Sequence, residues 1–391
     1  EYAIDPFMSG QGRIVDLKAS KINFDLGLFP NILSPKEEEN NYFKMLVVGA
    51  DEDSEAPNFN IDKISLQFFK DGVLIREMEK GDGATFGVLP AFVRSRQKSD
   101  SLDGGTKFYE LFGTSFDAIG VNIMGSTGLL IPVWERSTMT DDTFTYAIDL
   151  GTSNTFISRK KNGVNYQPEL FKMQRPMVSY LHEIPEDRQL SQTRLIENSI
   201  FEQAKNKIKT EFLPALIDGI DYKFPIRTAL CGITNPTASA KPNLFDNFNI
   251  AFFYERMMSN DDQNIHTDIK WEENEDELRI FVRELMLIIK CDVLQHNGDL
   301  DRTNLIWFRP LSFTGTTKSL YDDIWYGNPG GQKGEPEKVL FIDKSQIQCF
   351  TESEAPYYYF KKKAIIANSD AVTVIDIGGG SSDFVYFKDN T

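Results

Sequence analysis

The chain has 391 residues, more than a single hydrophobic core usually serves, so its length predicts two or three domains. Its hydrophobic fraction of 41% and charged fraction of 26% are ordinary for a globular protein and exclude a disordered chain. A formal net charge of −16 argues against nucleic acid as a partner, because neutralising phosphates requires clustered Lys and Arg.

The cysteines and the chain start indicate a cellular setting. Cys231, Cys291 and Cys349 are widely spaced and form no Cys-x-x-Cys pair, which supports neither a disulfide framework nor a zinc site and favours a reducing, cytoplasmic compartment. No apolar run approaches the roughly 20 residues that span a bilayer. Residues 1–6 lack both an initiator Met and the apolar core of a signal peptide, so we expect part of a longer chain that does not enter a membrane.

Residues 1–143 predict a β-rich module. Apolar and β-branched runs flank an Asp-Gly turn within 64–77, and a second pair of such runs flanks a Gly-Ser-Thr turn within 118–134, which is typical of two β-hairpins. Between them, 94–105 is polar and glycine-rich and predicts an exposed loop. The polar segment 138–143 predicts the boundary of the module.

From Tyr146 onward, strand patterns alternate with helical patterns, which is typical of an α/β domain. The residues after Asn235 mix Pro, Asn and aromatic side chains without a steady period, so we expect an insertion at 235–270. The other expected elements are an extended piece at 175–181, a polar helix at 191–212, a long helix at 273–289, a strand at 305–310 and a helix at 318–325.

Two stretches share an unusual pattern, Tyr146–Ser158 and Val372–Val385. In each, a β-branched run delivers one aspartate, Asp149 or Asp376, and then turns on glycine and hydroxyl residues. A carboxylate at the end of an apolar strand is costly unless a ligand or metal needs it. Glycine turns can bring backbone N–H groups close to an anion. The predicted phosphate contacts are Gly151, Thr152, Ser153, Asn154, Gly378, Gly379, Gly380, Ser381 and Ser382.

The two aspartates also predict a metal. Mg²⁺ prefers oxygen ligands, keeps several of its waters and is shared with substrate phosphates. Asp149 and Asp376 would therefore hold Mg²⁺ through its water shell, on either side of the bound phosphates. Together the two stretches predict a two-sided phosphate clamp.

Asp149–Thr155 resembles the first phosphate motif of the actin-like ATPase superfamily, and Asp376–Asp383 resembles its second; within that superfamily the DnaK-like heat-shock chaperones are the most similar. The resemblance covers about 146–391 and leaves the first 143 residues without a counterpart. It implies an α/β ribonuclease-H-like lobe at 144–370, which includes the insertion, and the truncated start of a second lobe at 371–391.

The resemblance also implies a catalytic glutamate at a strand-to-helix junction. Glu352 is the match and Glu354 the alternative, although capping of the helix that begins near Pro356 is a competing interpretation for Glu352. The family further uses a lysine near the γ-phosphate, for which Lys205, Lys207 and Lys209 are loose matches. We expect structural or surface roles for His182, His266 and His296.

The implied function is ATP hydrolysis in a chaperone-like or molecular-switch protein, with ATP and Mg²⁺ as cofactors and Glu352, Asp149 and Asp376 as catalytic residues. The N-terminal module would contact a protein client or partner. The alternative is a non-catalytic scaffold or assembly protein that retains the actin-like fold. A sugar kinase is a third interpretation, but no motif for a second substrate is visible. Because the adenosine-binding lobe would follow Thr391, we expect this chain alone to bind ATP weakly or not at all.

Overall fold

The structure is a computed structural model, and its chain divides into two compact units. The first unit contains 1–135, 177–213 and 235–244, and the second contains 136–176, 214–234 and 245–391. The residues that the structure describes are 24–49, 64–78, 86–88, 92–98, 101–123, 125–163, 166–172, 177, 179–181, 225–231, 249–250, 265–271, 275–327, 342–363, 365, 371–378 and 382–388.

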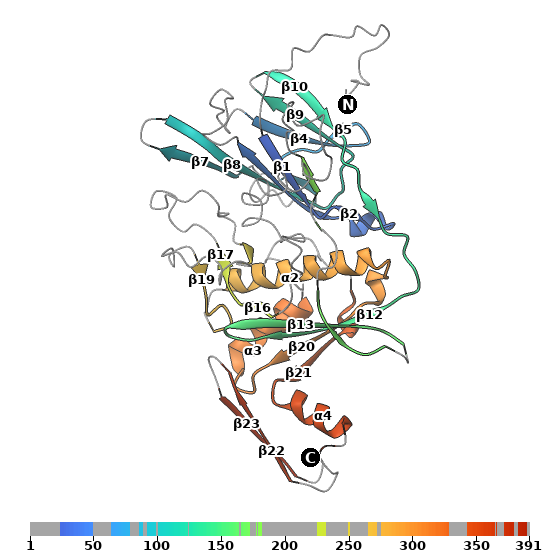
Figure 1. Cartoon of the computed structure of the whole chain (residues 1–391), viewed down its shortest axis with the longest axis vertical. Coiled ribbons are helices and arrows are strands. Elements are labelled where there is room, and N and C mark those ends of the chain that lie inside the picture. The colour runs from blue at the N-terminus through green and yellow to red at the C-terminus, as the bar shows by residue number, and fades with distance from the viewer. Residues whose placement is uncertain are drawn as a thin grey trace, which may run out of the picture. The chain divides into compact units, whose positions relative to one another are not determined.

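The first unit contains a six-stranded antiparallel sheet (Figure 1). Its strands are β15 (Ser179–Leu181), β1 (Phe24–Phe29), β3 (Tyr42–Gly49), β8 (Ser101–Phe112) and β6 (Gly87–Val88) in spatial order, with β7 (Phe92–Lys98) also paired to β8. Two shorter strands, β2 (Ile32–Leu33) and β11 (Glu135–Arg136), pair with each other, and a single turn of 3₁₀ helix occupies Glu37–Glu39.

A four-stranded sheet completes this unit, in the order β10 (Ser126–Leu130), β9 (Ala118–Ile123), β4 (Ile64–Lys70) and β5 (Val73–Leu74). The predicted hairpins at 64–77 and 118–134 are therefore present. Along β4 the side chains of Ile64, Leu66 and Phe68 are buried, and they alternate with exposed ones, as expected for a sheet with one covered face. These residues join Leu26, Phe43 and other side chains of the six-stranded sheet in one hydrophobic cluster, so the predicted β-rich module is built on a core shared by two sheets.

The loop predicted at 94–105 was wrong. Strands β7 and β8 form a long hairpin there, with Arg94 opposite Thr106 and Ser95 opposite Gly105, and its register shifts between Ser95 and Gln97. A β-ladder is held by backbone hydrogen bonds, so it can extend through polar and glycine-rich sequence that has no apolar alternation to reveal it.

The second unit is built on a mixed sheet (Figure 1). Its spatial order is β14 (Glu169–Leu170), β13 (Asn154–Lys161), β12 (Phe144–Leu150), β20 (Asn304–Arg309) and β21 (Ile347–Thr351), and β16 (Ile226–Arg227) also pairs with β13. The first three strands in sequence are antiparallel neighbours, whereas β20 and β21 run parallel to β12. Strand β12 buries Phe144, Tyr146 and Ile148 on one face.

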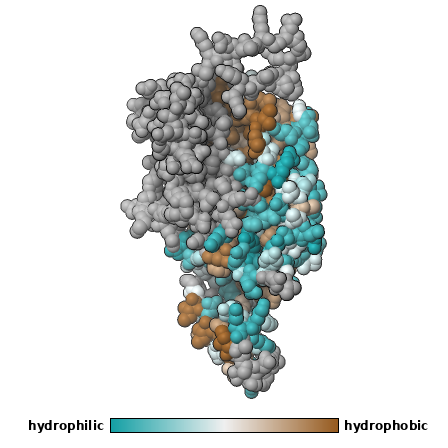
Figure 2. All heavy atoms as spheres, turned by 45° about the vertical axis from the view of Figure 1, so that its right-hand side comes forward, coloured by the Kyte–Doolittle hydropathy of each residue, from teal (hydrophilic) through white to brown (hydrophobic). Residues whose placement is uncertain are grey.

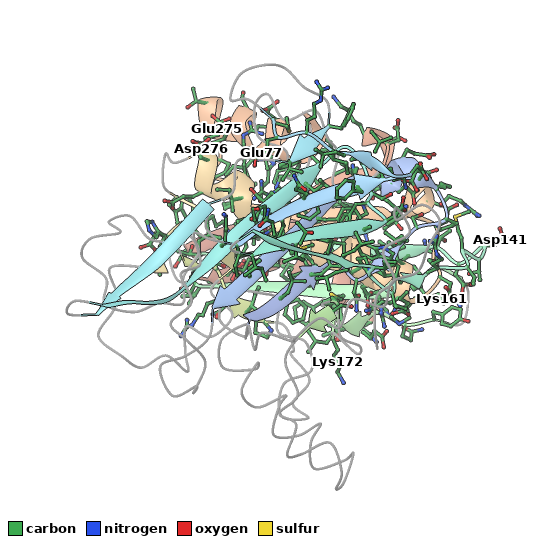
Figure 3. The ribbon with its side chains drawn as sticks, turned by 90° about the horizontal axis from the view of Figure 1, so that it is seen from above. Glu77, Asp141, Lys161, Lys172, Glu275 and Asp276 are labelled. Carbon is green, nitrogen blue, oxygen red and sulfur yellow. The ribbon has the colours of Figure 1, made fainter. Side chains whose placement is uncertain are left out.

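Helix α2 (Glu275–Gln295) lies along this sheet, where the sequence predicts a long helix (Figure 1). Glu275 and Asp276 stand at its first turn, where acidic side chains interact favourably with the positive end of the helix dipole (Figure 3). Asn297 just beyond the helix has a left-handed φ of 55°, and the N–H of Gly298 donates to the carbonyl oxygen of Val293, which terminates the helix.

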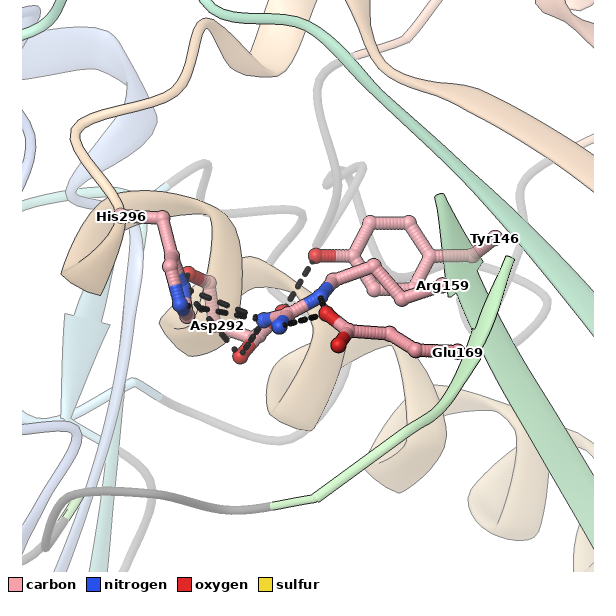
Figure 4. A network of polar contacts seen from close by, with 5 residues as sticks. All are labelled: Tyr146, Arg159, Glu169, Asp292 and His296. Carbon is pink, nitrogen blue, oxygen red and sulfur yellow. Dashed lines mark hydrogen bonds and ion pairs between the residues drawn. The ribbon is translucent and has the colours of Figure 1, made fainter. Parts of the chain in front are cut away.

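A buried polar network fixes the hairpin β12–β13 to α2 (Figure 4). The Tyr146 hydroxyl donates to Asp292 Oδ2 at 2.6 Å, and Nη1 of Arg159 donates to both oxygens of Asp292 at 2.9 and 2.8 Å. Arg159 also pairs with Glu169, and its Nη1 lies 3.2 Å from Nε2 of His296. Burial and the neighbouring Asp292 raise the pKa of Tyr146 well above its ordinary value, so the phenol keeps its proton and remains a donor.

The remaining elements of the second unit are short. They are the three-stranded sheet of β18 (Asn249–Ile250), β17 (Leu230–Cys231) and β19 (Ile265–His266), the 3₁₀ turns Leu300–Arg302 and Lys344–Gln346, helix α3 (Gly315–Asp322), the π-helical turn Asp323–Gly327, helix α4 (Glu354–Lys362), and the hairpin of β22 (Val372–Ile377) and β23 (Ser382–Phe387). In the part of the chain that the structure describes, no helix is both long and apolar enough to cross a membrane.

Candidate functional site

Both predicted glycine hairpins are present in the second unit. Strands β12 and β13 pair with Asp149 opposite Phe156 and Leu150 opposite Thr155, so residues 151–153 form the turn. Strands β22 and β23 pair with Asp376 opposite Asp383. Asp149 and Asp376 therefore each lie at the end of a strand that leads directly into its glycine turn.

The turn of the first hairpin depends on glycine because of a close approach. The N–H of Gly151 donates to the carbonyl oxygen of Asn154 at 3.1 Å, and a Cβ atom at position 151 would lie 2.6 Å from that oxygen. No L-side chain fits there without moving the turn. From the sequence, we expect the conformational freedom of glycine to matter at this position. In the structure, glycine is required because a Cβ atom would clash with the carbonyl oxygen of Asn154.

Thr228 anchors the same turn from outside the hairpin. Its hydroxyl donates to the carbonyl oxygen of Gly151 at 2.7 Å, and its N–H donates to the carbonyl oxygen of Ser153 at 3.1 Å. The Thr228 hydroxyl also lies 2.8 Å from that of Thr155, and both threonines are buried. These contacts tie the carbonyl groups of Gly151 and Ser153 to Thr228. Thr152, Ser153 and Asn154 keep some solvent exposure, with Ser153 and Asn154 the more exposed.

A buried lysine lies beside this turn. Lys270 follows β19 in a tight turn closed by the N–H of Trp271 donating to the carbonyl oxygen of Asp268. Its Nζ donates to Oε1 of Glu352 at 2.5 Å, and the hydroxyl of Tyr321 donates to its carbonyl oxygen at 2.9 Å. Lys270 is thus held at both its side chain and its backbone.

Glu352 stands at the junction between β21 and α4, where the sequence places it. Its N–H donates to the carbonyl oxygen of Arg309 at 2.9 Å, which fixes the backbone at the end of β20. Glu354 takes the capping role, because its carboxylate accepts from the N–H of Thr351 at 3.0 Å and from the Thr351 hydroxyl at 2.8 Å. The side chain of Glu352 is directed to Lys270 instead of to the helix end.

The carboxylates of the site influence one another. Burial raises the pKa of Glu352, Lys270 lowers it, and the charges of Asp149 and Asp376 raise it again, with a net rise above its ordinary value. The pKa of Asp149 is also raised, by desolvation against Lys270 and with a further contribution from Asp376. Asp149 remains an exposed residue, so solvent moderates its shift. Asp149, Glu352, Asp376 and Lys270 therefore form one electrostatic cluster, in which Lys270 and Asp376 each act on both Asp149 and Glu352.

The second hairpin is described only in part. Gly378 and Ser382 are exposed at its turn, whereas Gly379, Gly380 and Ser381 lie outside the described residues. Lys205, Lys207, Lys209 and His182 also lie outside them. His296 belongs to the buried network on α2, and Nδ1 of His266 lies 3.0 Å from Oε1 of Glu277.

Besides those of Thr228, the contacts of Lys270 and Trp271 in the site were not predicted from the sequence. Lys270 falls at the end of the expected insertion, and Trp271 beside it donates its indole N–H to the Thr152 hydroxyl at 2.6 Å. The signal that could have identified them is the segment Ile269–Trp271, where a lysine stands between two apolar residues, because a lysine in such a position is buried only with a partner.

Among the described residues, no group of three or more His, Cys, Asp and Glu side chains is arranged to enclose a metal ion. This arrangement still fits a hydrated Mg²⁺, since that ion needs only one or two carboxylates beside its waters and the substrate phosphates. The mutual repulsion between Asp149 and Asp376 is the kind of interaction that a divalent cation relieves.

Neither a scan against protein-family models nor a search of curated proteins finds a match for this sequence.

Proposed function

We propose that this chain carries the phosphate-binding part of an ATP-binding protein that resembles the actin-like ATPase superfamily, and that the full-length protein hydrolyses ATP as a chaperone-like protein or molecular switch. The observation that carries the proposal is the electrostatic cluster of Asp149, Glu352, Asp376 and Lys270. Its members come from four separate segments, and two of them precede the predicted phosphate turns.

The strand arrangement supports a ribonuclease-H-like lobe. Across the mixed sheet the strands lie in the order β14, β13, β12, β20 and β21. Counted along the chain, these are the third, second, first, fourth and fifth of the five strands. Strands β12, β13 and β14 are antiparallel neighbours, whereas β20 and β21 run parallel to β12, so this mixed sheet with its helices is compatible with the α/β lobe that the resemblance implies.

In this proposal the two hairpins bind the β- and γ-phosphates. The Thr152 hydroxyl and the backbone N–H groups of both turns donate to phosphate oxygens, and Lys270 places a positive charge where the transferred phosphoryl group gains negative charge. Water attacks the γ-phosphorus, the bond from that phosphorus to the bridging oxygen breaks, and ADP leaves with that oxygen. Glu352 or Asp149 accepts the proton of the water, a role for which a raised pKa is suited.

Asp149 and Asp376 would hold Mg²⁺ through its water shell. When bound, the ion supplies charge neutralisation of the phosphates. The N-terminal unit would contact a protein client or partner, and a cytoplasmic location fits the cysteine pattern.

The proposal is tested by ATP turnover in the full-length protein. Asp149→Ala and Asp376→Ala should each lower kcat by about 100-fold or more, because both remove preorganised charge at the reacting phosphate. Asp141→Ala, at an exposed position outside the cluster, is the matched control and should have no effect. If ATP turnover is absent, or is unchanged by the two substitutions, the proposed ATPase activity is contradicted. ATP binding without turnover would favour the scaffold alternative.

A further inference from the structure

The turn Asp268–Trp271 reaches two parts of the site at once. Lys270 extends to Glu352, and the adjacent Trp271 extends to Thr152 on the first hairpin. The indole of Trp271 is held edge-on against Phe313, with ring centroids 5.3 Å apart, and Phe313 itself is buried. Trp271 nevertheless keeps 38% of its surface exposed, so packing against Phe313 leaves the residue within reach of solvent.

The direction of this hydrogen bond determines what Thr152 can do. An indole N–H only donates, so the Thr152 oxygen must be the acceptor. A threonine hydroxyl has one proton and rotates to suit its neighbours. The Thr152 oxygen accepts the indole hydrogen bond, so the hydroxyl proton of Thr152 points away from Trp271. This proton is then free to be donated to an anion.

We propose that Trp271 is a positioning residue that orients the Thr152 hydroxyl as a donor to the phosphate of a bound nucleotide. The inference rests on the proposed function for the identity of the anion, and it goes beyond that function by assigning Trp271 a role. The proximity of Nζ of Lys270 to the indole, 5.7 Å from the ring centroid, also links the placement of the lysine to that of the tryptophan.

Affinity for ATP in the full-length protein gives the first test. Trp271→Phe keeps an aromatic ring against Phe313 but removes the N–H, and it should weaken ATP binding by about threefold to tenfold, the range for one lost hydrogen bond. Thr152→Val should weaken binding by at least as much. If the effect passes through the shared bond, the double variant binds as weakly as Thr152→Val alone. A melting temperature within ~2 °C of the unchanged protein separates positioning from misfolding.

A spectroscopic readout tests the same bond directly. With ¹⁵N-labelled tryptophan, the indole signal that disappears in Trp271→Phe should move in Thr152→Val and during titration with ATP or inorganic phosphate. The buried indoles of Trp307 and Trp325 should stay unmoved as internal controls.

The outcomes are distinguishable. Equal ATP affinity in Trp271→Phe, or an unmoved Trp271 signal in Thr152→Val, overturns the inference and leaves the proposed function standing. A signal that responds to inorganic phosphate in a protein that does not bind ATP overturns the proposed function and supports the positioning role toward an anion. A signal that responds to neither ligand overturns the inference, and the absence of ATP binding and turnover in the same full-length protein overturns the proposed function as well.

Discussion

The Nζ atom of Lys270 lies 2.5 Å from Oε1 of Glu352, and this buried ion pair joins residues 82 positions apart in sequence. The side chain of Lys270 is 4% exposed and that of Glu352 is 12% exposed, so water stabilises neither charge well. Each charge therefore depends on the other for its stabilisation. The lysine also lowers the pKa of Asp149 against the effect of burial. Lys270 thus stabilises the charged forms of two acids on different segments.

Replacing Lys270 should therefore damage both stability and turnover. Lys270→Ala leaves Glu352 buried without its cation, and we expect a loss of about 3 kcal/mol in the free energy of unfolding, measured by chemical denaturation. Lys270→Met combined with Glu352→Gln should recover most of that stability but no ATP turnover.

The control for this prediction is Lys161→Ala. Lys161, labelled in Figure 3, forms a partly exposed ion pair with Asp142, so its loss should lower the free energy of unfolding far less than the loss of Lys270. An equal loss in the two single variants would contradict a special role for the Lys270 pair.

The raised carboxyl pKa values predict a pH dependence. The folded chain holds protons on Asp149 and Glu352 that the unfolded chain, with ordinary pKa values of 3.8 and 4.5, has already released. Stability contributed by these neutral forms is present below the ordinary values and is lost as the pH rises through the raised ones.

Asp149→Asn should then be more stable than the unchanged protein near pH 7, by less than about 1 kcal/mol because Asp149 is exposed, and the difference should vanish toward pH 4. Chemical denaturation at several pH values measures it. A variant that loses stability at neutral pH would show that Asp149 is stabilised by its surroundings instead of opposed by them.

Gly151 should not tolerate a side chain. Gly151→Ala would bring a Cβ to 2.6 Å from the carbonyl oxygen of Asn154, so the turn must shift and its donors lose their alignment. We expect ATP affinity in the full-length protein to fall by about tenfold or more. Gly128→Ala is the matched control, since nothing lies within 4 Å of the added atom there. Unchanged affinity in Gly151→Ala would mean that this turn does not bind the nucleotide.

The buried network of Figure 4 should support stability without affecting the ligand. Tyr146→Phe removes the donor to Asp292, and a hydrogen bond to a charged group is worth roughly 2 kcal/mol. The same change at the exposed Tyr166 serves as the control. Thermal melting should separate the two variants, while ATP affinity in the full-length protein stays the same in both; a weakened affinity in Tyr146→Phe would assign the network a role in the site.

The hairpin β22–β23 should cause self-association of this chain. Within the described residues its strands pair only with each other, and the side chains of Ile377 and Phe384 are exposed. In Figure 2, apolar side chains gather at the lower end of the view, where Figure 1 places β22 and β23. Exposed apolar strands promote aggregation, so Ile377→Ser with Phe384→Ser should abolish concentration-dependent light scattering. Equal light scattering by the unchanged chain and the double variant would mean that another surface causes the self-association.

Apolar periodicity in the sequence predicted the helices and strands better than the polar residues predicted the contacts of the candidate site. The hairpin β12–β13 and helix α2 were visible because their apolar periods are regular, and Glu352 was found through a resemblance to a strand-to-helix junction. The hairpin β7–β8 was missed because its pairing comes from backbone groups that carry no side-chain signal.

Lys270 and Thr228 were missed for a different reason. Each contacts the site across a long stretch of sequence, Lys270 through Glu352 and Thr228 through Gly151, and such contacts exist only after the sheet has assembled. No spacing rule within one segment could pair them. The local sequence can mark Lys270 as a buried lysine that needs a partner, but only the tertiary structure shows that the partner is Glu352.

Because Cys291 is buried within α2, the rate at which a thiol reagent labels it should report the rate at which the surrounding structure opens. Burial raises the pKa of that thiol far above its ordinary value, so a thiol reagent in solution meets no reactive thiolate while the helix stays packed. Cys349 is partly exposed and should react first. In Cys231→Ser, the delay between the first and second labelled thiols would therefore measure how long the second unit stays closed, with no dye or denaturant needed.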